Sequence, residues 1–96
     1  MESQANSCWH KLLTVTVDEA QRGLTLAERE NAAAHGALRD WQARMLALEG
    51  HGDRSARDRA LPEKSRIDRE VERTDELLRQ AREALALAIA QREYKP

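Results

Sequence analysis

The side chains that most often carry metal or acid–base chemistry are scattered along this chain of 96 residues. The three histidines are His10, His35 and His51, and the single cysteine is Cys8. No histidine lies three or four residues from another or from the cysteine, as ligands on one face of a helix require. Cys8 and His10 would face each other only in an extended segment. The sequence therefore predicts no metal site and a structural or exposed cysteine.

Acidic pairs such as Asp75-Glu76, and Glu28 with Glu30, have the pattern of solvated helix faces. The sequence contains no glycine-rich phosphate-binding loop and no nucleophile elbow around a serine. We therefore expect no catalytic residues, no bound cofactor and no enzymatic activity.

Arginines are concentrated near the middle of the chain, at Arg54, Arg57 and Arg59. Such clusters bind the phosphate backbone of nucleic acids. Here Asp53 and Asp58 offset much of the positive charge, and no aromatic residue is present for stacking on bases. Nucleic-acid binding through these arginines is thus an alternative function rather than the expected one.

The stretch Asp58-Arg59-Ala60 resembles half of a tip motif found in RNA polymerase secondary-channel regulators of the DksA type. That motif has an acid, two residues, a second acid, one residue and an alanine. Ser55 stands at the place of the first acid, and the family's cysteine-bearing zinc module has no counterpart. The resemblance implies a transcription regulator that contacts RNA polymerase through a charged tip, which is a second alternative. The general shape also resembles helical-hairpin stalk proteins and small chaperones of bacterial export machines.

The strongest pattern is a heptad repeat, in which apolar residues alternate at spacings of three and four. The first run comprises Leu24, Ala27, Asn31, Ala34, Leu38, Trp41, Met45 and Leu48. The second comprises Ile67, Val71, Thr74, Leu78, Ala81, Leu85 and Ala88. Two long helices joined by a short connection pack as antiparallel neighbours. The predicted fold is all-α, a long coiled-coil-like antiparallel hairpin with an N-terminal helical extension.

The predicted single domain has a frayed N-terminus at 1–7, a first helix at 8–49, a tip loop at 50–61 and a second helix at 62–94. Two signals compete within the first helix, because capping boxes occur at Thr16 with Glu19 and at Thr25 with Glu28. The unbroken heptad favours one continuous helix, whereas Gly23 before the second box favours a kink or break there.

The predicted tip loop at 50–61 is inferred from two glycines and a proline. Gly50 and Gly52 suit the end of a helix, the apolar pattern disappears from 53 to 61, and Pro62 suits a first helical turn. Folding the chain about this loop predicts the pairs Leu48–Ile67, Trp41–Thr74, Leu38–Leu78, Ala34–Ala81 and Asn31–Leu85. Leu13 and Val17 would then extend beyond the second helix.

More apolar surface is present than one pair of helices needs, since no residue from Ala84 to Ala90 is polar. We expect a homodimer that forms a four-helix bundle, with a three-helix monomer as the alternative. The interface candidates are Trp9, Leu13, Val17, Asn31, Trp41, Leu77, Leu87 and Ile89. Asn31 either fixes the register within the core or is exposed, and Trp41 is either a core residue or an interface anchor.

Composition limits the remaining classes of function. The net charge is −1 with acids and bases interspersed, so no large field of one sign attracts nucleic acid or an acidic membrane. The lone cysteine, the absence of a signal peptide and the absence of a long apolar run predict a protein of the cytoplasm without membrane insertion. The predicted function is a non-catalytic adaptor, chaperone-like or inhibitory module that binds a protein partner through apolar helix faces.

Overall fold

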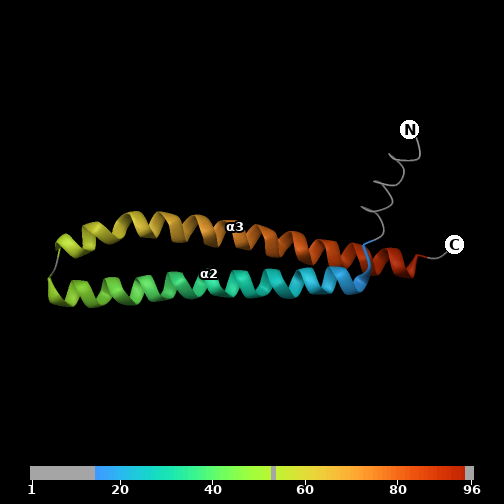
Figure 1. Cartoon of the computed structure of the whole chain (residues 1–96), viewed down its shortest axis with the longest axis horizontal. Helices are drawn as coiled ribbons and strands as arrows, with labels where there is room; N and C mark the ends of the chain where they lie inside the picture. Colours follow the sequence, from blue (N-terminus) through green and yellow to red (C-terminus); the bar gives the residue numbers. More distant parts are fainter. Residues whose placement is uncertain (1–14, 53, 95–96) are drawn as a thin grey trace, which may run out of the picture.

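The computed structural model describes residues 15–52 and 54–94, which form two long antiparallel helices. Helix α2 spans Val17–His51 and helix α3 spans Arg54–Glu93. The helices lie side by side along most of their length and are joined at one end, here called the tip (Figure 1). The opposite, open end holds the start of α2 and the end of α3. The predicted all-α hairpin is thus confirmed.

Helix α2 begins where the first capping box predicts. Thr16 is extended, with φ −70° and ψ 157°, and its Oγ1 accepts a hydrogen bond of 3.1 Å from the Glu19 amide. Asp18 and Glu19 add negative charge to the positive end of the helix dipole. Val15 and Thr16 therefore precede the helix, although the sequence placed them inside it. Residues 1–14, with the rest of the predicted extension, lie outside the described residues.

Helix α2 runs through Gly23 without a break. Thr25, which the second capping box would place before a new helix, instead donates its hydroxyl to the Gln21 carbonyl one turn earlier. The helix ends at His51, and Gly52 follows in the left-handed conformation with φ 69°. The Gly52 amide donates to the Glu49 carbonyl at 3.2 Å, which closes the last turn.

The buried residues of both helices follow the predicted heptads, and together they form the seam of the hairpin. On α2 they are Ala20, Ala27, Ala34 and Trp41, and on α3 they are Thr74 and Ala88. All six occupy positions separated by multiples of seven along their helix, so one row from each helix faces the other. Most of these side chains are small, and the seam therefore buries little apolar volume for two helices of this length.

The second helix begins eight residues earlier than predicted. Helix α3 starts at Arg54, so the expected loop at 50–61 is reduced to a tight turn, and Pro62 lies inside the helix. An internal proline removes one backbone hydrogen bond and bends a helix. Pro62 is exposed, so the affected turn faces water. Ala56 and Ala60 are partly buried and extend the seam to the tip.

The shorter turn also changes the predicted register. Asn31 contacts Thr74 rather than Leu85, and Trp41 contacts the Ala60 carbonyl rather than lying opposite Thr74. Val17 lies beside Ala88 and Arg92 and so does not extend beyond the second helix. The seam residues were predicted correctly, whereas their pairing was shifted along the hairpin. Neither described helix combines the length and apolar character needed to cross a membrane.

Candidate functional site

One side of the hairpin carries a row of shallow grooves between the two helices, here called the groove face. Its inner positions, next to the seam, are Gly23, Glu30, Ala37 and Arg44 of α2 and Glu63, Glu70, Leu77 and Ala84 of α3. These residues recur every seven positions on each helix, which places them on the same flank of the seam. Towards the tip the groove face is charged, and Arg44 Nη2 is 2.7 Å from Glu63 Oε1.

Towards the open end the groove face is apolar. The groove there is lined chiefly by Val15, Ala20, Gly23, Leu26, Ala27, Leu77, Ala81 and Ala84. Leu26 is 58% exposed and Leu77 is 37% exposed, although both are large apolar side chains. Glu19, Glu30 and Gln80 are the polar residues of this lining. A groove of small residues between exposed leucines is shaped to accept the side chains of another helix.

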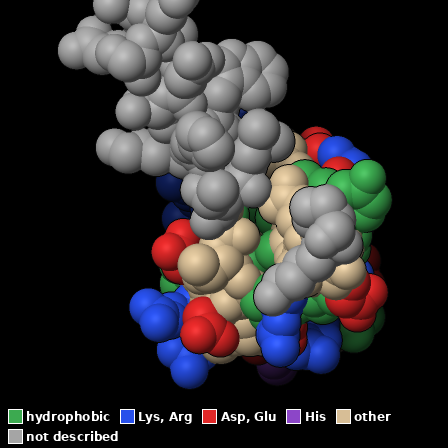
Figure 2. All heavy atoms as spheres, turned by 90° about the vertical axis from the view of Figure 1, so that its right-hand side faces the viewer, with side chains coloured by type: hydrophobic (Ala, Val, Ile, Leu, Met, Phe, Trp, Pro, Cys, Tyr) green, Lys and Arg blue, Asp and Glu red, His purple; other side chains and the backbone are tan. Residues whose placement is uncertain are grey.

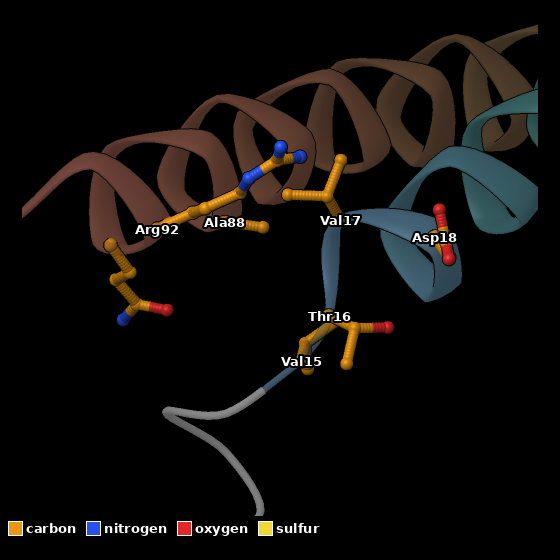
Figure 3. A pocket seen from close by; sticks show the side chains of 7 residues that line it. Val15, Thr16, Val17, Asp18, Ala88 and Arg92 are labelled. Atoms are coloured by element: carbon orange, nitrogen blue, oxygen red, sulfur yellow. The ribbon is translucent and has the colours of Figure 1, made fainter.

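At the open end, a pocket separates the start of α2 from the last turns of α3. Val17 points from α2 toward Ala88 and the side chain of Arg92 (Figure 3). Seen onto this end, hydrophobic side chains reach the surface beside charged ones (Figure 2). The apolar surface is therefore exposed where the hairpin opens.

The opposite flank of the seam carries a polar cluster formed by Asn31, His35, Thr74 and Asp75. The Asn31 amide donates to Thr74 Oγ1 at 3.2 Å and to Asp75 Oδ1 at 2.6 Å. His35 Nε2 lies 2.8 Å from the same carboxylate oxygen, which accepts from the ring. Thr74 is 1% exposed and donates its hydroxyl to the carbonyls of its own helix. These contacts satisfy a partly buried amide within one chain and fix the register of the two helices.

Acidification is expected to weaken this cluster. The hydrogen bonds from His35 and then Asn31 hold the pKa of Asp75 below its usual value. A lowered carboxyl pKa adds stability above the ordinary value of about 3.9, and that stability is lost as the pH falls through the folded-state pKa. The melting temperature of the wild type should therefore approach that of Asp75→Asn once the pH falls below the lowered pKa of Asp75. A Cγ titration by NMR with a midpoint at or above the ordinary value would contradict this expectation.

Trp41 lies in the core rather than on a free interface, with an exposed fraction of 6%. Its indole Nε1–H donates to the Ala60 carbonyl at 3.1 Å, and Lys64 Nζ lies 5.9 Å from the ring centroid. The hydrogen bond ties α2 to the first turns of α3, close to the proline. Trp41 therefore stabilises the tip half of the seam, where α3 would otherwise be weakest.

The other interface candidates divide between the two flanks. Leu77 lines the apolar groove, and Leu87, 57% exposed, lies three residues beyond Ala84 on the same side of α3. Ile89 is 40% exposed but lies two heptads beyond Asp75, on the flank of the polar cluster. Trp9 and Leu13 lie outside the described residues. Leu26 and Gly23 were missed, although the sequence shows Leu26 as an apolar residue outside the heptad.

The tip candidates occupy the first turns of α3 and not a loop. The side chain of Arg57 pairs with Glu49 at 3.1 Å, and Arg59 Nε donates to the Ser55 carbonyl at 3.2 Å. Arg54, Arg57, Asp58 and Arg59 are all exposed. Because Arg59 faces a groove near Trp41 while Arg57 faces Glu49, the arginines do not form one positive surface.

Across residues 15–52 and 54–94, no three His, Cys, Asp or Glu side chains gather as a metal site. His35 contacts Asp75, and His51 is the exposed last residue of α2. No protein-family model, curated protein or solved structure matches the chain.

Proposed function

We propose that this protein is a non-catalytic interaction module that binds helices of protein chains through the apolar half of its groove face. The observation that carries the proposal is the exposure of Leu26 and Leu77 on either side of a groove floored by alanine and glycine. A helix laid in this groove would bury both leucines against its own apolar stripe. The surrounding charges would select among partners, and apolar burial would supply the affinity.

The proposal includes self-association as a homodimer, which would complete a four-helix bundle. The small side chains of the seam support it, because a lone hairpin of this size has little core. We also propose that the module works in a reducing compartment such as the cytoplasm, which the single Cys8 supports. An adaptor, a chaperone-like protein and an inhibitor would each use such a surface.

The proposal predicts that a labelled amphipathic peptide helix with one Leu/Ala stripe binds the full chain, as measured by fluorescence anisotropy. Leu77→Glu should weaken this binding by about tenfold or more, because burying a leucine contributes about 1.5–3 kcal/mol. Ile89→Glu is the matched control, since the same change lies on the opposite flank. A polar peptide of equal charge should not bind.

Two results would contradict the proposal. Binding that resists Leu77→Glu but is lost in Ile89→Glu would move the interaction to the other flank. A chain that binds no apolar helix and shows no self-association at any concentration would show that the groove face is not a binding surface for helices. Circular dichroism should first show that both variants keep the helical content of the wild type.

A further inference from the structure

The groove face has two outer rows whose charges differ. The outer row of α2 is formed by Glu19, Leu26, Ala33 and Asp40, each seven residues after the last. The outer row of α3 is formed by Arg59, Arg66, Arg73, Gln80 and Leu87 with the same spacing. The first row is acidic and apolar, whereas the second is basic towards the tip and apolar towards the open end. Two surfaces of this kind are complementary to each other but not to themselves.

The contacts between the helices fix which residues share a level along the hairpin. Arg44 pairs with Glu63, so Asp40, one turn before Arg44, lies level with Arg66, about one turn after Glu63. Nearer the open end, Glu30 and Leu77 line the same groove, and Arg73 lies one turn from Leu77. The acid of each pair is on α2 and the base is on α3.

Two copies can pack face to face in two symmetric ways. If the two-fold axis runs along the hairpin, α2 of each copy faces α3 of the other at the same level. Asp40 then meets the second copy's Arg66, Glu30 meets its Arg73 and Leu26 meets its Leu77, and each contact occurs twice. The apolar halves cover each other, and the charges of the two outer rows meet with opposite signs.

If the two-fold axis runs across the hairpin, each helix faces its own reversed copy. Full overlap brings Arg73, near the middle of α3, close to its own counterpart, although the Glu70 carboxylate that pairs with each Arg73 offsets part of the repulsion. Overlap of the apolar grooves alone brings Glu19 against the second copy's Glu30, because these acids mark the two ends of the α2 lining. Both antiparallel arrangements oppose like charges, which destabilises an interface.

From this pattern we propose that the occupant of the groove face is a second copy of this chain, packed with both tips at the same end. The proposal rests on the proposed function, because it names the partner of the same apolar surface. The resulting four-helix bundle buries Leu26 and Leu77 of both copies. It also leaves the polar cluster of Asn31, His35 and Asp75 on its outside.

A charge exchange tests the pairing. Asp40→Lys and Arg66→Glu should each weaken the dimer by about tenfold, because each replaces two attractive contacts by repulsive ones. The doubly exchanged chain should regain the dissociation constant of the wild type. Arg82→Glu, on the flank of the polar cluster, is the control and should leave the dimer unchanged. The measurement is sedimentation equilibrium over a range of concentrations, at low salt.

The orientation is tested by a spin-label distance in a Cys8→Ser, Ser55→Cys chain, which carries one label at each tip. Tips at the same end give a distance comparable to the width of two hairpins. Tips at opposite ends give a distance that approaches or exceeds the 67 Å length of the hairpin.

The outcomes separate this inference from the proposed function. A dimer with a short distance and a restored double exchange supports the inference. A dimer whose tip labels are far apart overturns the inference. A dimer whose dissociation constant is not restored by the double exchange also overturns it. A chain that stays monomeric also overturns it, together with the proposed homodimer, while peptide binding that is lost in Leu77→Glu would still support helix binding through the groove face. A chain that neither dimerises nor binds the peptide would overturn both proposals.

Discussion

Replacing Trp41 by alanine is expected to lower the free energy of unfolding by about 3–5 kcal/mol, the cost of deleting a buried aromatic side chain. Trp41 is the largest side chain in the seam and is 6% exposed. The substitution also leaves the Ala60 carbonyl without its indole donor, close to the turn that Pro62 has already weakened. Urea unfolding followed by circular dichroism measures the loss.

Two controls separate the contributions of Trp41. Trp41→Phe keeps most of the apolar volume and removes the hydrogen bond, so its cost should include about 1 kcal/mol for that bond. Leu46→Ala removes a large apolar side chain that is 69% exposed and should change stability little. If Trp41→Ala cost no more than Leu46→Ala, the indole would not be a core residue.

Replacing Thr74 by aspartate is expected to destabilise the hairpin by about 3 kcal/mol or more, because it places an unpaired charge in the most buried position. Thr74 is 1% exposed, and the new carboxylate would lie close to Asp75. The Asn31 amide cannot neutralise this charge. Thermal unfolding at neutral pH should show the loss, and acidification should reduce it by protonating the new carboxyl group.

The same substitution at Thr25, which is exposed on α2, is the matched control. Thr25→Asp should change stability by a few tenths of a kcal/mol, as is usual for exposed positions. Thr74→Val keeps the shape and removes only the hydroxyl group, so its effect should lie between the two. Equal effects of aspartate at both sites would show that Thr74 is not enclosed by the hairpin.

The residues of the seam were predictable because their periodicity is a local property of each helix. Leu24, Leu38 and Leu85 have the expected spacing whether or not the helices pair correctly, and the burial of Trp41 and Thr74 follows from the same repeat. The capping box at Thr16 was also visible in the sequence, but it competed with a second box at Thr25, and the predicted helix began earlier, at residue 8.

The register was not predictable from those local signals. Pro62 at the edge of a charged segment resembles a helix start, whereas α3 extends back to Arg54, where the partly buried Ala56 and Ala60 continue the contact between the helices. An error in the length of the tip displaces every cross-helix pair. The partners of Asn31 and His35 therefore depended on information that the heptads do not contain.

The candidate site was only partly predictable for a related reason. Leu77 and Leu87 were identified because they exceed what one stripe per helix requires. The other wall of the groove, with Gly23 and Leu26, depends on which flanks meet across the seam. Ile89 looked equivalent to Leu87 in sequence, and the hairpin places the two residues on different flanks.

The single sharp turn at Gly52 has a practical consequence for anyone who labels this protein. Because the described part of the chain reverses direction at this turn, Val15 and Tyr94 both lie at the open end, and Val15 lines the apolar groove and the end pocket. A label attached at either of these two residues would therefore lie at the open end, where the apolar groove is found. An insertion between Gly52 and Arg54 would be held at the far end of a rod 67 Å long.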